Sequence, residues 1–281
     1  MARIPKLLPR EVDLAVTAAQ CVVETHKRIV PFLRVGQTLA QIDAEVARIL
    51  ESLGCQSCFL GYKVGRSPAF PGHACLSVND CVVHGFAGLY DRPMREGDLL
   101  KIDIGVWKNG FVGDAGWTYC FKAYPSPAVQ KLMDVGKESL RRGVAKLTPG
   151  NTYLAWAREV QGCVEVEHKL HLVRGLGGHG IGMKKNDRER GLHLPPFVAN
   201  VVPEAHNDWP EGVLPCEPGV LIAVEPMLAL GTGETVHRSN PWPVYTKDGS
   251  LSSHYEHDVL ITESGPRVLT EGMEQLPDLV G

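Results

Sequence analysis

The spacing of apolar residues predicts a helical first segment. Residues 10–33 carry apolar side chains at the three- and four-residue intervals of an amphipathic helix. Thr38 and Gln41 then stand three positions apart, the spacing of a capping box, and a second helix is expected from there to about Leu53. The chain therefore begins with a pair of helices.

A second helical pair is predicted in the middle of the chain. Residues 126–147 begin with Ser-Pro, a serine cap followed by proline at the first helical position, and end before a Thr-Pro-Gly break. Asn151 or Thr152 caps the next helix, which extends to about His168. These two helices repeat the arrangement of the first pair.

Extended segments rich in β-branched and aromatic residues separate and follow the helices. They are expected near 74–78, 81–84, 99–107, 111–121, 170–174, 220–226 and 254–262. The proline-rich stretch 195–219 predicts a long irregular connection, and the charged stretch 184–190 predicts a solvated loop. This mixture of helices and strands indicates an α+β fold.

One predicted hairpin contains two aspartates in an apolar setting. Residues 101–119 read KIDIGVWKNGFVGDAGWTY, in which Asn-Gly is a strong hairpin signal. Any two-residue loop puts Asp103 and Asp114 on one face: a Lys108-Asn109 loop makes them direct partners, and a loop one residue later makes them diagonal neighbours. Direct partners would lie about 5 Å apart and repel each other. Either a cation lies between them, or both are solvated on an edge hairpin.

A weak internal repeat accompanies the two helical pairs. Gly-x-Thr occurs at residues 36–38 and again at 150–152, 114 positions later, and each copy is followed by Glu-Val at the same distance. Two similar halves, about 10–122 and 123–270, would place a site between them within a single domain spanning 1–281. The alternative is chance similarity between two capped helices.

Composition and charge exclude some classes of function for this chain. The 281 residues are 44% hydrophobic and 22% charged, with a net charge of −3, so no basic surface for nucleic acid or anionic membrane is expected. No apolar run approaches the ~20 residues of a membrane helix, and no secretory signal is recognisable. Eight scattered cysteines favour a reducing cytoplasm, and the single Cys55-Gln-Ser-Cys58 motif indicates packed thiols rather than zinc ligands.

Two further polar residues stand in unusual surroundings. His179 lies among five glycines in GLGGHGIG, and it is either a metal ligand or part of a tight turn. The G-x-G-x-x-G match in this stretch is not interpreted as a dinucleotide site, because a charged loop follows it instead of a helix. Glu225 is isolated in LIAVEPMLAL, where an unpaired buried carboxylate would need a cation or a raised pKa.

A third unusual stretch is SSHYEHDVLIT, where Glu256 precedes an apolar strand. His254 shares the face of Glu256 and His257 lies on the other face, and both histidines are interpreted as bystanders. Four carboxylates and one imidazole suit a pair of divalent ions among Mn(II), Fe(II), Co(II) and Zn(II). The predicted metal ligands are Asp103, Asp114, His179, Glu225 and Glu256.

Five ordered motifs connect the chain with a known family. They are SVNDCVVHG (77–85), KIDIGVWKNGFVGDAG (101–116), GGHGIG (177–182), AVEPM (223–227) and WPVYTKDGSLSSHYEH (242–257). From about residue 10 to 270 the chain resembles type I methionine aminopeptidases in their short bacterial form. The resemblance implies the creatinase-like pita-bread fold, in which two pseudo-symmetric α+β halves form a curved antiparallel sheet covered by helices.

The resemblance also implies a role for each site residue. Asp103 would chelate one metal, Asp114 and Glu256 would bridge the two, and His179 and Glu225 would complete the other. The implied catalytic groups are His84 at the scissile peptide, His193 at the substrate carbonyl and Glu225 as proton shuttle. The implied substrate pocket, which His84 adjoins, is lined by Tyr62, Phe70, Cys75 and Trp242.

The implied activity is removal of N-terminal methionine by dinuclear-metal hydrolysis. The implied partners are N-termini of peptides and nascent proteins, with the ribosome as a candidate, and a monomer without nucleic-acid recognition is expected. Three alternatives stay open: an Xaa-Pro-type peptidase of the same fold, a non-catalytic pita-bread binding protein, and a metal enzyme of unrelated fold and chemistry. Xaa-Pro enzymes usually carry a further N-terminal domain, which is not expected in this chain.

Overall fold

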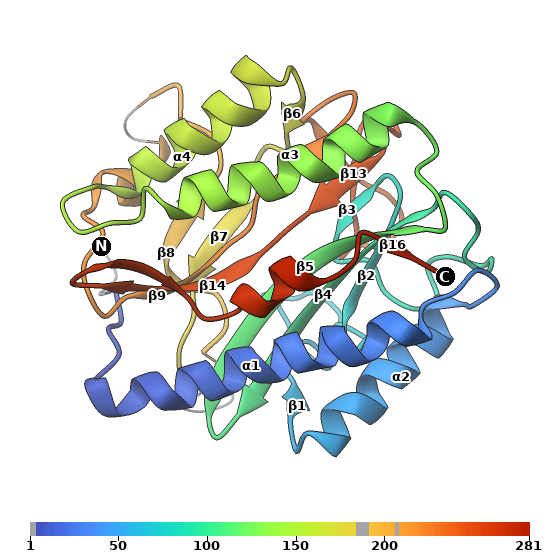
Figure 1. Ribbon diagram of the computed structural model, residues 1–281, viewed down its shortest axis with the longest axis horizontal. Coiled ribbons are helices and arrows are strands. Elements are labelled where there is room, and N and C mark those ends of the chain that lie inside the picture. Colours follow the sequence, from blue (N-terminus) through green and yellow to red (C-terminus); the bar gives the residue numbers. More distant parts are fainter. Residues whose placement is uncertain (1–3, 184–190, 206–207) are drawn as a thin grey trace.

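The computed structural model describes residues 4–183, 191–205 and 208–281 (Figure 1). The charged stretch 184–190, predicted to be a solvated loop, lies outside the described residues. No helix in the described part of the chain combines the length and the apolar character needed to span a bilayer.

The first helical pair forms as predicted. Helix α1 spans Val12–Ile29, between the 3₁₀ turns η1 (Pro9–Glu11) and η2 (Val30–Phe32), and α2 spans Leu39–Ser52. The capping box is present: Thr38 N donates to Gln41 Oε1 at 2.9 Å, and Gln41 N donates to Thr38 Oγ1 at 3.3 Å. These two bonds satisfy backbone donors that the first turn of a helix leaves unpaired.

The second pair differs from prediction at its end. Helix α3 spans Pro127–Val144 and α4 spans Tyr153–Gln161, but the expected continuation to His168 is a π-helix, η3 (Gly162–Glu167). Two short 3₁₀ turns follow later, η5 (Pro210–Val213) and η6 (Glu271–Gln275). Helical periodicity alone could not distinguish α from π geometry over this last turn.

The strands form two larger and two smaller sheets. One larger sheet has the order β1 (Gln56–Ser57), β4 (Leu99–Lys108), β5 (Phe111–Phe121) and β16 (Leu279–Val280), with β2 (Cys75–Val78) also on β4. The other has the order β15 (Gly265–Val268), β14 (His257–Thr262), β9 (Leu221–Val224), β7 (Gly177–Gly180) and β8 (Leu194–Ala199). Among the described pairings, β16 with β5 is parallel and the others are antiparallel.

The smaller sheets have three strands each. They are β13 (Ser252–His254), β10 (Met227–Ala229) and β6 (His171–Leu172), and β11 (Thr235–His237), β12 (Val244–Thr246) and β3 (Cys81–Val83). In Figure 1 the strands lie between α1 and α2 on one side and α3 and α4 on the other. The inner faces of both helical pairs are therefore buried against the sheets. Whether the two halves are a true repeat stays a prediction.

The β4–β5 hairpin settles the register of the two aspartates. Its turn is Asn109-Gly110, and both residues have positive φ (53° and 84°), as expected for a two-residue hairpin loop. Asp103 and Asp114 are consequently diagonal neighbours on one face, and they are only 9% and 3% exposed. Each faces a glycine across the ladder, Gly116 and Gly105 respectively. The solvated edge-hairpin alternative is therefore wrong.

Two other expectations need correction. The stretch 195–219 is not irregular throughout, because β8 adds to β7 at the edge of the second large sheet. The glycine-rich stretch around His179 is strand β7, so the tight-turn alternative is wrong. Its glycines permit close strand packing: a Cβ on Gly178 would lie 2.2 Å from Ala223 O, and one on Gly180 would lie 2.2 Å from Pro195 O.

Candidate metal centre and substrate cleft

The two large sheets bring the five predicted ligands together. Asp103 lies on β4 and Asp114 on β5, His179 lies on β7, Glu225 directly follows β9, and Glu256 lies between β13 and β14. His179 Nε2 is 4.0 Å from Asp114 Oδ2 and 3.7 Å from Glu225 Oε1. The backbone N–H of Glu256 donates to Gly116 O at 2.9 Å, which holds this glutamate against the aspartate hairpin.

The ligand atoms form two overlapping clusters. One contains Asp103, His254 and Glu256, and the other contains Asp114, His179 and Glu256, with all ligand atoms of each cluster within 4.8 Å of one another. Glu256 belongs to both clusters. This arrangement could hold two cations that share one carboxylate.

The electrostatics of the centre demand positive charge. Burial raises the pKa of Asp103 and of Glu225 to about 7. Burial, followed by repulsion from neighbouring carboxylates, raises the pKa of Asp114 and Glu256 well above the ordinary range. Oδ1 of Asp103 and Oδ1 of Asp114 are buried with no hydrogen-bond partner in the described part of the chain. Buried carboxylates without partners are costly, so these residues fit divalent cations.

His254 belongs to this centre, so its interpretation as a bystander is wrong. Its Nε2 lies 3.3 Å from Glu225 Oε2 and 3.8 Å from Glu256 Oε2. Burial lowers the pKa of His254 to about 4, which keeps the imidazole neutral. The position of His254 two residues before Glu256 was the available signal. His257, by contrast, points to Thr270, with Nδ1 2.9 Å from Thr270 Oγ1.

A further buried acid supports the centre from behind. Asp258 Oδ2 accepts a hydrogen bond from the backbone N–H of Asp114 at 2.9 Å, and Asp258 is 1% exposed. This contact connects β14 to β5 directly behind a predicted ligand. Sequence reasoning did not identify Asp258, because nothing in the local pattern reveals which strand lies beside it.

A cavity of about 440 Å³ lies beside the centre. Its lining includes His84, His179, His193 and Glu225, together with apolar residues of β3, β8 and β10. His84 and His193 have positive φ values of 58° and 54°. Non-glycine residues adopt this conformation at a cost of about 1–3 kcal/mol, and such strain concentrates at functional sites.

Both cleft histidines are neutral. Burial lowers the pKa of His84 to about 4 and that of His193 well below its usual range. His193 Nδ1 lies 2.7 Å from the hydroxyl of Tyr62, and the His193 ring stacks edge-on to His179 with centroids 4.3 Å apart. The structure thus places His193 between the cluster of carboxylates and an aromatic group.

The four predicted pocket residues cluster beside the centre. The Phe70 ring packs edge-on to Trp242 at 5.4 Å, and Tyr62 lies 6.3 Å from Trp242. Trp242 Nε1 donates to Pro68 O at 2.9 Å, so the indole is fixed in orientation. Cys75 pairs with Asp103 across β2 and β4, which brings its thiol to the aspartate hairpin. These residues are all in one apolar cluster.

The Cys-x-x-Cys motif lies outside this pocket. Cys55 and Cys58 are both buried, and none of the eight cysteines is in a disulfide. This agrees with the interpretation of the Cys-x-x-Cys motif as packed thiols.

Comparisons with known proteins place this geometry in a family. The model of metallopeptidase family M24 matches residues 14–263. A methionine aminopeptidase from Aquifex aeolicus is 34% identical over 263 residues, covering 93% of this chain and 96% of that protein. The crystal structure of a methionine aminopeptidase from Thermotoga maritima superimposes with a TM-score of 0.83 at 28% identity, covering 95% of this chain and 99% of that one.

The fold extends to more distant proteins. An Xaa-Pro dipeptidase from Bacillus anthracis superimposes with a TM-score of 0.69 at 18% identity, over 95% of this chain and 62% of that one. This likeness concerns the fold alone. The predicted α+β pita-bread class is confirmed, with antiparallel sheets between helical pairs.

Proposed function

The chain belongs to metallopeptidase family M24, and from that membership we propose that it removes methionine from the N-termini of peptides and nascent polypeptides. One observation carries the proposal. Three buried carboxylates and the partly buried Glu225 converge beside an aromatic cluster that contains a thiol. A cation-binding centre and a specificity pocket are the two parts that this reaction needs.

Asp103, Asp114, His179, Glu225 and Glu256 would hold two divalent ions, among Mn(II), Fe(II), Co(II) and Zn(II). Such ions, when bound, lower the pKa of water and polarise a peptide carbonyl. The neutral imidazole of His254 adds a nitrogen donor to the same cluster. Histidine and carboxylate donors together suit these transition metals better than magnesium or calcium.

Glu225 is proposed to move the proton. In the centre without cations, burial raises the pKa of its carboxyl group to about 7. A carboxyl group that faces both water and substrate can accept a proton from one and release it to the other. It lines the cleft and is 12% exposed, which leaves it accessible to water and to substrate. Glu225 would take a proton from the attacking water and transfer it to the leaving amine.

His193 is proposed to stabilise the oxyanion. If the Tyr62 hydroxyl donates to Nδ1, the ring proton resides on Nε2, where it can be donated to the substrate carbonyl oxygen. His84, which also lines the cleft, would contact the scissile peptide. The low pKa of both rings keeps them neutral, so they do not compete with metal ions for the carboxylates.

The residues of the proposed substrate pocket are suited to a methionine side chain. Tyr62, Phe70 and Trp242 provide aromatic surface, and Cys75 provides a polarizable sulfur at the pocket floor near Asp103. A flexible thioether packs favourably against aromatic rings. The adjacent carboxylates would attract the free α-amine of the substrate, which favours chain ends over internal peptide bonds.

The surroundings of the enzyme are part of the proposal. Eight cysteines without a disulfide suit a reducing cytoplasm, where nascent chains emerge from the ribosome. We expect a monomer. The Xaa-Pro alternative is supported by fold alone, whereas the methionine aminopeptidase relatives share about a third of their residues with this chain.

A peptide-hydrolysis assay tests the proposal. Met-Ala-Ser and Ala-Pro-Ala are each incubated with metal-depleted protein and again after Mn(II) or Co(II) is added. We expect free methionine from the first peptide only, and only with metal. Asp103→Asn should abolish this activity, while the exposed control Asp91→Asn should retain it. Cleavage of Ala-Pro-Ala instead would establish the Xaa-Pro alternative, and cleavage of neither peptide would indicate a binding protein.

A further inference from the structure

A second group of metal-binding side chains lies on the outer helices. Glu138 of α3, Cys163 of η3 and His168, which directly follows η3, bring one oxygen, one sulfur and one nitrogen within 4.8 Å of one another. None of the three residues belongs to the centre or cleft described above. They represent three types of donor atom from two packed elements.

The π-helix produces this juxtaposition. In an α-helix, residues five apart point about 140° away from each other, because each residue turns the helix by about 100°. In η3 the backbone N–H of His168 instead donates to Cys163 O at 3.1 Å, an i→i+5 bond, which widens the turn and brings both side chains to the face toward α3. Lys131 Nζ donates to His168 O at 2.8 Å and fixes the end of the turn.

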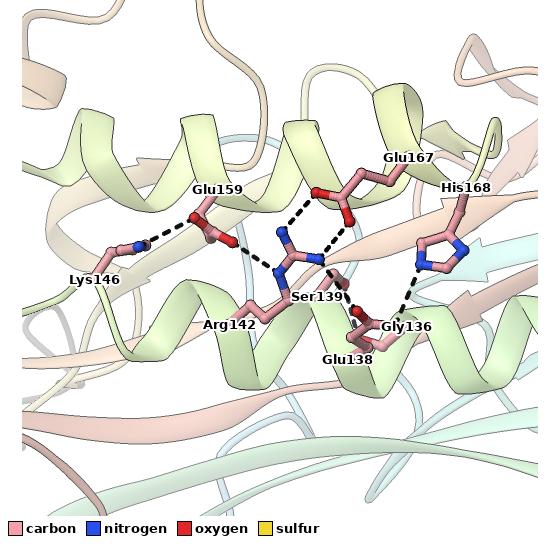
Figure 2. A network of polar contacts seen from close by, with 8 residues as sticks. All are labelled: Gly136, Glu138, Ser139, Arg142, Lys146, Glu159, Glu167 and His168. Carbon is pink, nitrogen blue, oxygen red and sulfur yellow. Dashed lines mark hydrogen bonds and ion pairs between the residues drawn. The ribbon is translucent and has the colours of Figure 1, made fainter.

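The two oxygens of Glu138 have different neighbours, as Figure 2 shows. Oε1 accepts from Arg142 Nη1 at 3.2 Å, whereas Oε2 lies 3.3 Å from His168 Nε2. The Arg142 guanidinium is also bound by Glu159 at 2.7 Å and by both oxygens of Glu167 at 2.7 Å. Other carboxylates therefore neutralise the positive charge of Arg142, and Oε2 of Glu138 is available to another cation.

The spacing suits a tetrahedral ion. Zn–N and Zn–O bonds of about 2.0–2.1 Å place the two ligand atoms about 3.3–3.4 Å apart. The separation between Nε2 of His168 and Oε2 of Glu138 is 3.3 Å. A thiolate at about 2.3 Å from zinc would lie about 3.6 Å from either of the other two ligand atoms. The sulfur of Cys163 lies within 4.8 Å of both atoms, so a movement of about 1 Å is enough to bring it into the coordination sphere.

The site is accessible to an ion from solvent. The side chains of His168 and Glu138 are 30% and 36% exposed, while Cys163 lies beneath them and is fully buried. An ion would enter from the exposed side and keep water as its fourth ligand. The Cys163 thiol would release its proton to solvent when the metal–sulfur bond forms.

We propose that Glu138, Cys163 and His168 form a second, independent binding site for a zinc-class divalent cation, which connects α3 to the end of η3. Thiolate and imidazole ligands select zinc, cobalt or cadmium over magnesium and calcium. The site goes beyond peptide hydrolysis, and its occupancy stabilises the helical pair without altering the cleft. The competing explanation is a plain ion pair between Glu138 and protonated His168.

Cobalt(II) titration of the full chain tests the proposal, because thiolate-to-cobalt charge transfer gives a near-ultraviolet band. We expect the band in the unaltered protein and its loss in Cys163→Ser. His168→Gln should weaken cobalt binding at this band about tenfold or more. The control His171→Gln changes an exposed histidine outside the group of Glu138, Cys163 and His168, and it should leave cobalt binding at this band unchanged.

Three results would overturn the proposal. The first is absence of the band. The second is its persistence in Cys163→Ser, which would assign the band to another cysteine, and the third is equal cobalt affinity in His168→Gln. Should Cys163→Ser fail to fold, the partly exposed His168→Gln carries the test. Methionine release by His168→Gln should equal that of the unaltered protein, so failure of this site and failure of the proposed function give different results.

Discussion

The two cleft histidines show how single residues reveal function. His84 and His193 have positive φ, which a β-carbon disfavours, and a lowered pKa keeps both rings neutral. A fold retains such residues only where the surrounding structure enforces them. The strain therefore marks both positions independently of any sequence motif.

His193→Ala should lower turnover of Met-Ala-Ser by about 10²-fold or more, because one donor to the oxyanion is lost. Substrate affinity should change less, since the pocket rings remain. Tyr62→Phe keeps the ring and removes the hydroxyl that contacts His193 Nδ1, so a smaller loss is expected. Steady-state kinetics of both variants measure this, and near-normal turnover in His193→Ala would reassign the role.

At the scale of elements, the packing of α1 on the hairpin positions the metal centre. Gly113 of β5 directly precedes Asp114, and it lies against the backbone of Ala18 in α1. A Cβ at Gly113 would be 2.5 Å from the carbonyl oxygen and carbon of Ala18. Rigid backbone on both sides leaves no flexible atom to move, so the helix and hairpin must separate to accommodate any side chain.

Gly113→Ala should destabilise the protein by about 1–3 kcal/mol or more, the range for overpacked cores, and should also weaken metal binding through the adjacent Asp114. The matched control is Gly162→Ala. Gly162 has a helical φ of −58° with no atom near its missing Cβ, so alanine there should stabilise by about 0.5–1 kcal/mol. Urea unfolding measures both, and equal stability of the two variants would contradict the packing argument.

At the scale of the whole molecule, the candidate metal ligands lie where the two large sheets meet, so cations bound there would connect the sheets. Asp103 and Asp114 come from one large sheet, Glu225 and Glu256 from the segments after β9 and β13, and His179 from the other large sheet. Without cations the carboxylates are like charges held close together. Their mutual repulsion must weaken the junction between the two sheets. Metal ions bound there would stabilise the folded state as well as enable the chemistry.

Metal removal should therefore lower the unfolding free energy. Adding Mn(II) at 100 times its dissociation constant should raise it by about 2.7 kcal/mol if one site fills, and more if two fill. Asp103→Asn should reduce this gain, whereas Asp91→Asn should keep it. Thermal unfolding with and without Mn(II) measures the shift, and an unchanged transition in the unaltered protein would argue against metal at the junction.

The amino-acid sequence by itself determined the parts of this protein that depend on near neighbours. Helical periodicity, the Thr38–Gln41 capping box and the Asn-Gly turn are interactions within a few residues. The capping box formed where it was predicted, and the hairpin took one of the two loops that the sequence left open. The aspartates and the isolated Glu225 could be singled out for the same reason, because a polar residue in an apolar strand is visible locally.

Only the tertiary structure decided what depends on distant partners. The short strand β8 exists because β7 lies beside it, and η3 became a π-helix where His168 packs toward α3. His254 and Asp258 entered the metal centre through the pairing of β13 and β14 with other strands. Contacts between residues far apart in sequence leave no periodicity along the chain, so they emerge only when the sheets pack.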